Sequence, residues 1–217
     1  MKKIAVLLSG CGVFDGTEIH EAVLTLLAIT RAGAQYQCFA PDIAQMHVVN
    51  HLTGEVNTDE KRNVLVESAR IARGDVHNVS SLEISQFDAL VIPGGFGAAK
   101  NLSNFATTGS NCHVNPIVER FILEFALAHK PVGFVCISPI MIPTLYGKGA
   151  IGTIGEDSDT AHAFNEMGGQ HQGAKVEDIV VDTVNKIVST PGYMLATSIV
   201  EAQIGIEKLV NKVLEMA

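Results

Sequence analysis

Three short segments carry the residue types that can do covalent or acid–base chemistry, and each directly follows a run of apolar residues. They are Ser9–Gly16, Pro93–Gly97 and Cys136–Pro139. In open α/β sheets, ligands bind beyond the carboxyl ends of the strands. The glycines in these segments let the backbone approach a ligand closely. The sequence therefore predicts one ligand site at which these segments meet.

Cys136 is the strongest candidate nucleophile. It ends the apolar run Val132–Cys136, and Ser138 and Pro139 suit the N-cap and the first position of a following helix. A thiol at the positive end of a helix is expected to have a lowered pKa, which favours the reactive thiolate. The alternative is a buried structural residue, because free cysteine is often found in protein cores. The local sequence leaves both interpretations open.

Glu18 is the candidate carboxylate partner. Asp15 and Glu18 have the spacing of a capping box with Asp15 at the N-cap, so a structural role is the simpler interpretation. The functional alternative places Glu18 in the same crevice as Cys136. There it would hydrogen-bond the thiol and carry protons to and from a bound carbonyl compound. The two roles are compatible.

Other motifs are too incomplete to predict a cofactor or a metal. Gly10 and Gly12 resemble the start of a dinucleotide fingerprint, but Asp15 stands where the third glycine is required. His47 and His51 have the spacing of two metal ligands on a helix, without a clear third ligand. The four cysteines lack Cys-x-x-Cys spacing, which argues against zinc and against a disulfide framework. We expect no cofactor, no metal and a reducing cytoplasm.

Composition limits the classes of partner. The chain has 217 residues, of which 47% are hydrophobic and 18% charged, and a net charge of −8. That charge argues against a nucleic-acid partner. No apolar run reaches the ~18 residues that cross a bilayer, and the apolar run Ile4–Leu8 is too short for a signal peptide. We therefore expect neither a membrane span nor a targeting segment.

Short apolar runs alternate with longer stretches at helical period, which is typical of β-α-β units around a parallel sheet. The expected strands are Ile4–Leu8, Gln35–Ala40, Ala89–Ile92 and Val132–Cys136, and Ile179–Val181 with Lys186–Ser189 form an expected hairpin. Helices are expected after Asp15 with the apolar stripe Ile19, Val23, Leu26 and Leu27, then at Asp59–Arg73, Val114–His129 and Thr197–Leu214. The prediction is a single α/β domain over residues 1–217, doubly wound, with a mostly parallel sheet and a C-terminal hairpin and helix.

Longer segments show a family resemblance. Ser9–Ala22, Ile92–Phe105, Gly133–Ile137 and Thr190–Ala196 resemble the glyoxalase ElbB family (enhancing lycopene biosynthesis proteins) of the ThiJ/PfpI superfamily. The similarity runs from Lys2 to the C-terminal helix. It implies a flavodoxin-like fold related to class I glutamine amidotransferases.

The resemblance also implies a site and an activity. The nucleophilic cysteine of a strand-to-helix elbow falls at Cys136, and its carboxylate partner on the first helix falls at Glu18. Such relatives convert glyoxal-type 2-oxoaldehydes to hydroxy acids without glutathione, a lyase-class reaction, and some are described as protein deglycases. For this chain the implied conversion is glyoxal to glycolate, with a small dicarbonyl substrate and a homodimer.

The chain departs from the superfamily pattern at two places, and these differences limit the reactions that can be expected of it. Many relatives have a histidine directly after the nucleophile, where this chain has Ile137. Glutamine amidotransferases need a late His-x-Glu pair, and Pro191–Met194 contains neither residue. Glutaminase chemistry is therefore not expected.

A glyoxalase reaction at these residues predicts specific roles. The Cys136 thiolate adds to one aldehyde carbon, and backbone N–H groups of Gly95 or Phe96 and of Ile137 hold the oxyanion. Glu18 then shuttles the proton that turns the hemithioacetal into a thioester, which water hydrolyses.

Two functions of other classes stay open. In a non-catalytic thiol-based redox sensor, Cys11 at the exit of the first strand approaches Cys136 and pairs with it on oxidation. An accessory protein of isoprenoid biosynthesis is suggested by the family's name alone.

Overall fold

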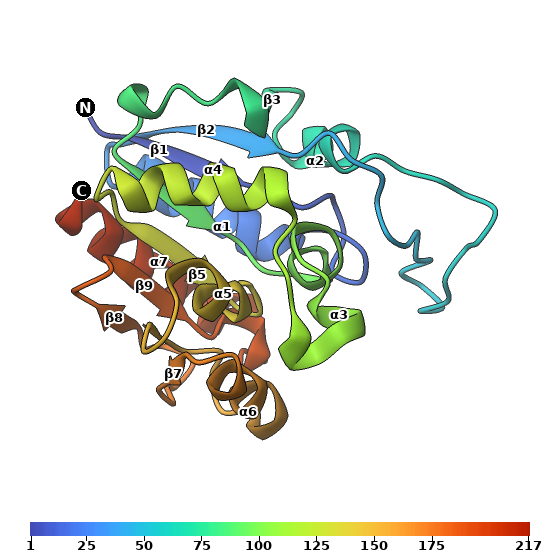
Figure 1. Cartoon of the computed structure of the whole chain (residues 1–217). Coiled ribbons are helices and arrows are strands. Elements are labelled where there is room, and N and C mark those ends of the chain that lie inside the picture. The colour runs from blue at the N-terminus through green and yellow to red at the C-terminus, as the bar shows by residue number, and fades with distance from the viewer.

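A seven-stranded sheet forms the middle layer of the molecule, with the strand order β3-β2-β1-β4-β5-β9-β8 (Figure 1). The computed structural model describes residues 1–217. The strands are β1 (Lys3–Leu7), β2 (Gln35–Ala40), β3 (Val76–Asn78), β4 (Ala89–Ile92), β5 (Val132–Val135), β8 (Val180–Asp182) and β9 (Ile187–Thr190). Every neighbouring pair is parallel except the β8–β9 hairpin. The predicted flavodoxin-like α/β fold with a mostly parallel sheet is confirmed.

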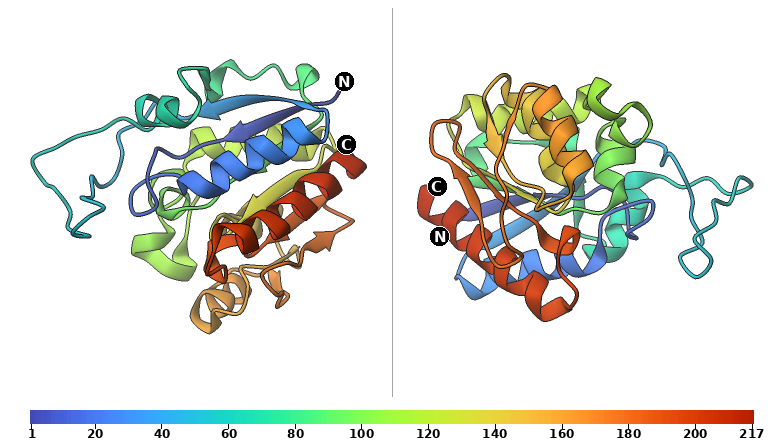
Figure 2. Two further views of the ribbon diagram at one scale, coloured as in Figure 1. Left: turned by 180° about the vertical axis from the view of Figure 1, so that it is seen from behind. Right: turned by 90° about the horizontal axis from the view of Figure 1, so that it is seen from below.

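Helices cover both faces of this sheet, which is why its central strands are apolar along their whole length. The helices are α1 (Ile19–Arg31), α2 (Val64–Ile71), α3 (Phe105–Thr108), α4 (Pro116–Leu127), α5 (Ile142–Tyr146), α6 (Ser158–Glu166) and α7 (Ile199–Met216). Helices α1 and α7 lie side by side on one face (Figure 2). A core cluster of 20 buried residues packs there, and one of 25 packs under α4 and α5 on the other face. A small parallel pair, β6 (Ile151–Gly152) and β7 (Gln170–His171), forms a second sheet, and β6 contacts β8 and β9 of the main sheet.

The first helix begins later than predicted. Glu18 is its N-cap residue, because the Glu18 side chain accepts a hydrogen bond of 2.6 Å from the N–H of Glu21. The predicted N-cap, Asp15, is instead buried and accepts from the N–H of Val49 at 2.7 Å. The capping-box assignment was therefore wrong, although a carboxylate does start the helix.

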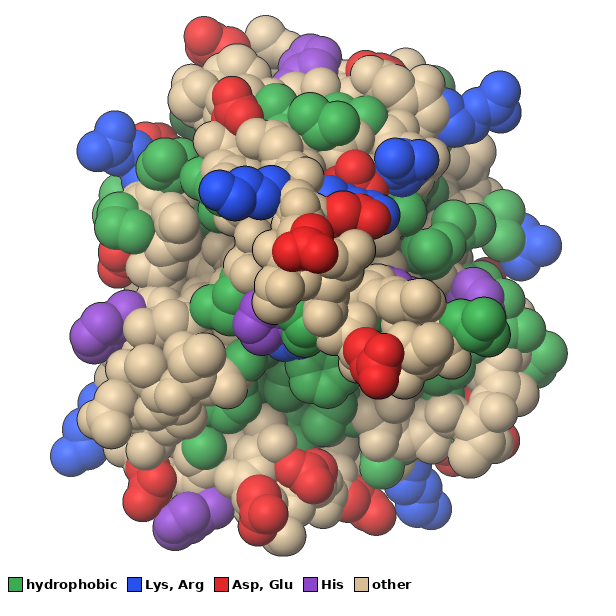
Figure 3. All heavy atoms as spheres, turned by 90° about the vertical axis from the view of Figure 1, so that its right-hand side faces the viewer, with side chains coloured by type: hydrophobic (Ala, Val, Ile, Leu, Met, Phe, Trp, Pro, Cys, Tyr) green, Lys and Arg blue, Asp and Glu red, His purple; other side chains and the backbone are tan.

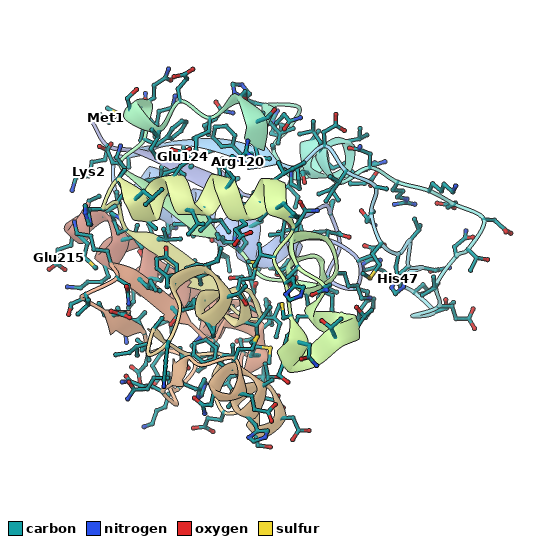
Figure 4. The ribbon with its side chains drawn as sticks, viewed as in Figure 1. Met1, Lys2, His47, Arg120, Glu124 and Glu215 are labelled. Carbon is teal, nitrogen blue, oxygen red and sulfur yellow. The ribbon has the colours of Figure 1, made fainter.

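Residues 41–63 form an irregular segment that extends away from the body of the protein (Figure 1). The helix predicted at Asp59–Arg73 therefore lacks its first turn. Helix α2 starts only at Val64, because the Asn63 side chain caps it by accepting from the N–H of Val66. Two antiparallel bridges close the base and the tip of the segment. His47 lies on this segment, on the side of the molecule opposite Lys2 and Glu215, which are near the chain termini (Figure 4). No helix combines the length and the apolar character that crossing a membrane requires.

Candidate active site

Cys136 occupies a sharp turn directly after β5. Its φ of +63° is in the left-handed region, which non-glycine residues rarely adopt and which often marks a functional site. Ser138 is not the predicted helix cap. Its hydroxyl lies 2.9 Å from the carbonyl oxygens of Ile92 and Val135 and accepts from the N–H of Val135. These contacts join the ends of β4 and β5 and fix the turn that presents the sulfur.

The carboxylate in contact with the Cys136 thiol is Glu21 rather than the predicted Glu18. Glu21 is fully buried, and each of its oxygens accepts a backbone hydrogen bond of 2.9 Å, one from the N–H of Gly94 and one from that of Tyr193. Burial raises the pKa of Glu21 to about 7 despite these donors, and a further hydrogen bond joins its side chain to Cys136. The carboxyl group is therefore held in one orientation against the sulfur.

The predicted lowering of the Cys136 pKa is contradicted. Only 7% of the residue is exposed, and burial together with the nearby Glu21 charge raises the thiol pKa well above its ordinary value. The segment after the turn is a 3₁₀ helix, Ser138–Met141, followed by the five-residue α5, so a long helix dipole is absent. At neutral pH the thiol keeps its proton until a neighbouring base removes it.

Two backbone N–H groups, those of Gly95 and Ile137, act as donors that partly offset the rise of the Cys136 pKa. Both are predicted oxyanion donors, and neither N–H is taken by another backbone carbonyl oxygen. The Phe96 N–H, the third predicted donor, is occupied by the carbonyl oxygen of Val13 at 2.8 Å. Gly95 has a φ of +93°, and a Cβ there would lie 2.3 Å from the backbone nitrogen of Glu18, so only glycine fits.

A cavity of about 580 Å³ opens above Cys136 at the carboxyl edge of the sheet. It is lined by Val13, Glu18, Gly95, Phe96, Ala99, Lys100, Phe105, Ala106, Cys136, Ile137, Asp157, Thr160, Tyr193 and Met194. Figure 3 views this side of the molecule and shows a hollow lined with hydrophobic side chains near its centre. The structure therefore brings Glu18, Gly95, Phe96 and Ile137 to the cavity that contains Cys136, and no histidine lines it.

Cys11 is not brought to this cavity. Its sulfur is half-buried beside Glu67 and Arg70, and burial with the Glu67 charge raises its pKa. All four cysteines are free. The expected approach of Cys11 to Cys136 is therefore wrong, because the exit loop of β1 turns this side chain toward α2 rather than toward β5.

Of the two histidines with metal-ligand spacing, His51 makes backbone contacts, whereas the Nδ1 atom of His47 is buried without a hydrogen-bond partner. The Nε2 atom of His51 accepts from the N–H of Phe14 at 3.2 Å, and its Nδ1 atom lies 3.0 Å from the Val49 carbonyl oxygen. His47 is on the same extended segment. No group of three or more histidine, cysteine or acidic side chains is placed to hold a metal ion.

Comparison with known proteins gives the family. No protein-family model matches the chain. The rat mitochondrial ES1 protein homolog is 46% identical over 223 aligned residues, which cover 99% of this chain and 84% of the rat protein. The chain belongs to the ES1 family. A human member, the mitochondrial glutamine amidotransferase-like class 1 domain-containing protein 3, is 45% identical over 99% of this chain and 83% of its own length.

Solved structures extend the ES1 relationship. An isoprenoid biosynthesis protein with an amidotransferase-like domain from Ehrlichia chaffeensis has a TM-score of 0.91 and 40% identity, over 99% of this chain and all of the other. Glyoxalase III from Candida albicans shares the fold, with a TM-score of 0.63 and 13% identity over 99% and 97% of the two chains. The relationship to class I glutamine amidotransferases that the sequence implied is confirmed by the Ehrlichia chaffeensis and human relatives, and a ThiJ/PfpI-like domain from Anabaena variabilis shares the fold. The rat and human relatives are named as mitochondrial, so the cytoplasmic location expected from the sequence is not confirmed.

Proposed function

We propose that this ES1-family protein is a cofactor-independent glyoxalase that converts glyoxal-type 2-oxoaldehydes to hydroxy acids. The observation that carries the proposal is the arrangement around Cys136: one sulfur in a strained turn, one buried carboxyl against it and two backbone N–H groups directed at it. This arrangement supplies a nucleophile, a base and an oxyanion site in one cavity. The shared fold with a glyoxalase III supports the same class of reaction.

The first step is addition of the thiol to an aldehyde. As sulfur bonds to the carbonyl carbon, the Cys136 proton passes to Glu21, whose pKa of about 7 suits a group that accepts and returns a proton near neutral pH. The carbonyl oxygen gains the electron pair, and the N–H groups of Gly95 and Ile137 stabilise its charge. Protonation of that oxygen gives the hemithioacetal. A base beside the sulfur removes the need for a free thiolate, which the raised thiol pKa makes scarce.

The second step is an internal transfer of reducing equivalents. The hydrogen on the carbon attached to sulfur leaves as a proton, and the neighbouring aldehyde carbon gains a proton through an enediol. The first carbon is thereby oxidised to a thioester and the second is reduced to an alcohol, so no external oxidant is required. Glu18 carries this proton in the proposed reaction, and its position in the cavity lining supports that role. Water then hydrolyses the thioester, releasing glycolate and the thiol.

Product analysis tests this proposal. Glyoxal is incubated with the wild-type protein and with Cys136→Ser, and glycolate is quantified by NMR. We expect the serine variant to lose at least a hundredfold in rate, because hydroxyl is a far weaker nucleophile in this setting. Cys11→Ser, which changes a thiol outside the cavity, is the matched control and keeps full activity. Equal glycolate formation by wild type and Cys136→Ser would refute the proposal.

A deglycase role, in which the same thiol attacks a glycated side chain, is a form of this activity and shares its test. A thiol-based redox sensor is the alternative of another class. Its expected Cys11–Cys136 bridge has no support, because the two side chains lie in different surroundings. Peroxide oxidation of Cys136 at low dose, without glyoxal turnover, would favour the sensor.

We further propose a homodimer that acts on small carbonyl compounds, without nucleic-acid or membrane partners, in the reducing cytoplasm or an equivalent compartment. The four free thiols support a reducing setting. A link to isoprenoid biosynthesis is supported only by the name of the Ehrlichia chaffeensis relative. Light scattering at graded concentrations tests the dimer.

A further inference from the structure

The cavity above Cys136 is much larger than glyoxal. Glyoxal has four non-hydrogen atoms. If each takes the ~30 Å³ that a water molecule occupies in the liquid, glyoxal fills about 120 Å³. The cavity holds about 580 Å³, a size typical of sites for larger ligands. Most of its lining is apolar, including Phe105, Ile137 and Met194. The space beyond the reacting carbon therefore suits a carbon chain.

Lys100 is the only basic side chain that lines this cavity. Its Nζ atom donates to the carbonyl oxygen of Phe14 at 2.8 Å and lies 5.4 Å from the centre of the Phe96 ring. No carboxylate forms a salt bridge with it. An ammonium group has three donors, so two remain for a ligand. Partial burial lowers the Lys100 pKa, while the Asp15 charge opposes that effect.

The backbone around Lys100 is built to direct this side chain. Residues Ala98–Leu102 form a π-helix, η3, a rare conformation that is common at functional sites. The neighbouring Asn101 side chain is buried and donates to the carbonyl oxygens of Ser9 and Asp15, both at 2.9 Å. Asn101 thus anchors η3 to the loop after β1, and Lys100 is left at the cavity.

We propose that Lys100 anchors an anionic group of the substrate. This inference rests on the proposed role of Cys136 as the nucleophile, and it names the substrate class: an aldehyde with an apolar chain that ends in a carboxylate or a phosphate. The aldehyde lies at the sulfur, the chain contacts Phe105 and Met194, and the anion pairs with the Lys100 ammonium. Glu18 and Asp157 also line the cavity, so an anion is favoured at the Lys100 position and repelled elsewhere.

Reversible addition to the thiol provides a direct measure of this preference. The Cys136 sulfur bonds to the aldehyde carbon, and the thiol proton is balanced by the new hydroxyl of the hemithioacetal, so nothing leaves. Aldehydes labelled with ¹³C at the carbonyl carbon report the adduct by NMR. Matched pairs are succinic semialdehyde with butanal, and 6-oxohexanoate with hexanal. Glyceraldehyde 3-phosphate with glyceraldehyde distinguishes phosphate from carboxylate, and Cys136→Ser supplies the blank.

In wild type, the anionic member of at least one pair is expected to bind about tenfold more tightly, as a charge-assisted hydrogen bond predicts. Lys100→Met, which keeps the side-chain length, should abolish the preference, and Lys100→Arg should retain most of it. Equal affinities within every wild-type pair, or a preference unchanged in Lys100→Met, would overturn the inference. Glyoxal turnover by wild type is measured separately. Turnover without an anion preference would refute only the role of Lys100, and an anion preference without turnover would refute only the glyoxalase activity.

Discussion

Replacing Glu21 with glutamine should change how the stability of this protein depends on pH. The buried carboxyl has a folded-state pKa of about 7, raised from an ordinary value of 4.5. An acid with a raised folded-state pKa favours folding while it is protonated. Its contribution is complete below about pH 4.5 and is lost as the pH rises through 7. At 1.36 kcal/mol for each pKa unit, the loss is about 3 kcal/mol.

Glutamine does not ionise, so Glu21→Gln lacks this loss. The variant has a separate cost, which is independent of pH. Both carboxyl oxygens of Glu21 accept backbone hydrogen bonds, and the glutamine amide must turn its NH₂ group toward either Gly94 or Tyr193. Leaving one buried donor unpaired costs about 1–3 kcal/mol. The variant should therefore be the less stable protein at pH 5 and match or exceed wild type at pH 8.

Urea unfolding followed by circular dichroism, at steps between pH 4.5 and 8.5, measures both curves. Groups that titrate identically in the two proteins cancel in the difference, which isolates position 21. Glu124→Gln is the matched control, because the Glu124 side chain is exposed on α4 and makes no contact with Glu21, and its curve should follow wild type. Parallel curves for wild type and Glu21→Gln would refute the argument that burial controls the Glu21 proton.

Three further substitutions test the packing around the site. Gly95→Ala should abolish glycolate formation, because its Cβ would meet the backbone of Glu18 at 2.3 Å; unchanged kinetics would contradict the oxyanion assignment. Ser138→Ala should lower the free energy of unfolding by about 1–3 kcal/mol, since the ends of β4 and β5 lose a buried hydroxyl. A thermal melt checks this, and an unchanged melting temperature counts against it. Gly133→Ala places a Cβ 2.7 Å from the Leu209 side chain, so urea denaturation should show a loss of about 1–3 kcal/mol, and no loss would show that α7 shifts freely.

The sequence predicted six of the seven strands of the main sheet, because buried parallel strands are apolar throughout and are bounded by glycine and proline. It missed the short edge strand β3 and the short helices α3 and α6. For the first helix, the same pattern predicted the wrong buried face. Its predicted core stripe included Ile19, Val23 and Leu27, yet these side chains are 42%, 50% and 40% exposed. The buried face carries Ala22 and Glu21 instead. That face mixes polar, small and apolar side chains, including Leu24 and Ile29, so the more continuous hydrophobic stripe on the other face concealed it.

That error of face is also why Glu21 was missed. The family resemblance indicated a carboxylate on this helix, and Glu18 was the nearer match to the glycine-rich turn. A carboxylate one turn further on, flanked by Ala22 and in line with Thr25, would have suggested an acidic side chain turned inward. The predicted approach of Cys11 to Cys136 was wrong for a different reason. The direction of a side chain in an irregular loop cannot be predicted from the hydrophobicity of its neighbours in the sequence.

The extended segment of residues 41–63 is fastened to the loop that follows β1. Asp15 accepts from the N–H of Val49, and the His51 ring accepts from that of Phe14. That same loop holds the Phe14 carbonyl bonded to Lys100 and the Gly16 carbonyl that accepts from Gly97. The tip of the segment, where Leu52 is 95% exposed, is thus connected through this loop to the residues that line the cavity. Proteolytic cleavage of the segment would weaken the support of the cavity wall and leave Cys136 unchanged.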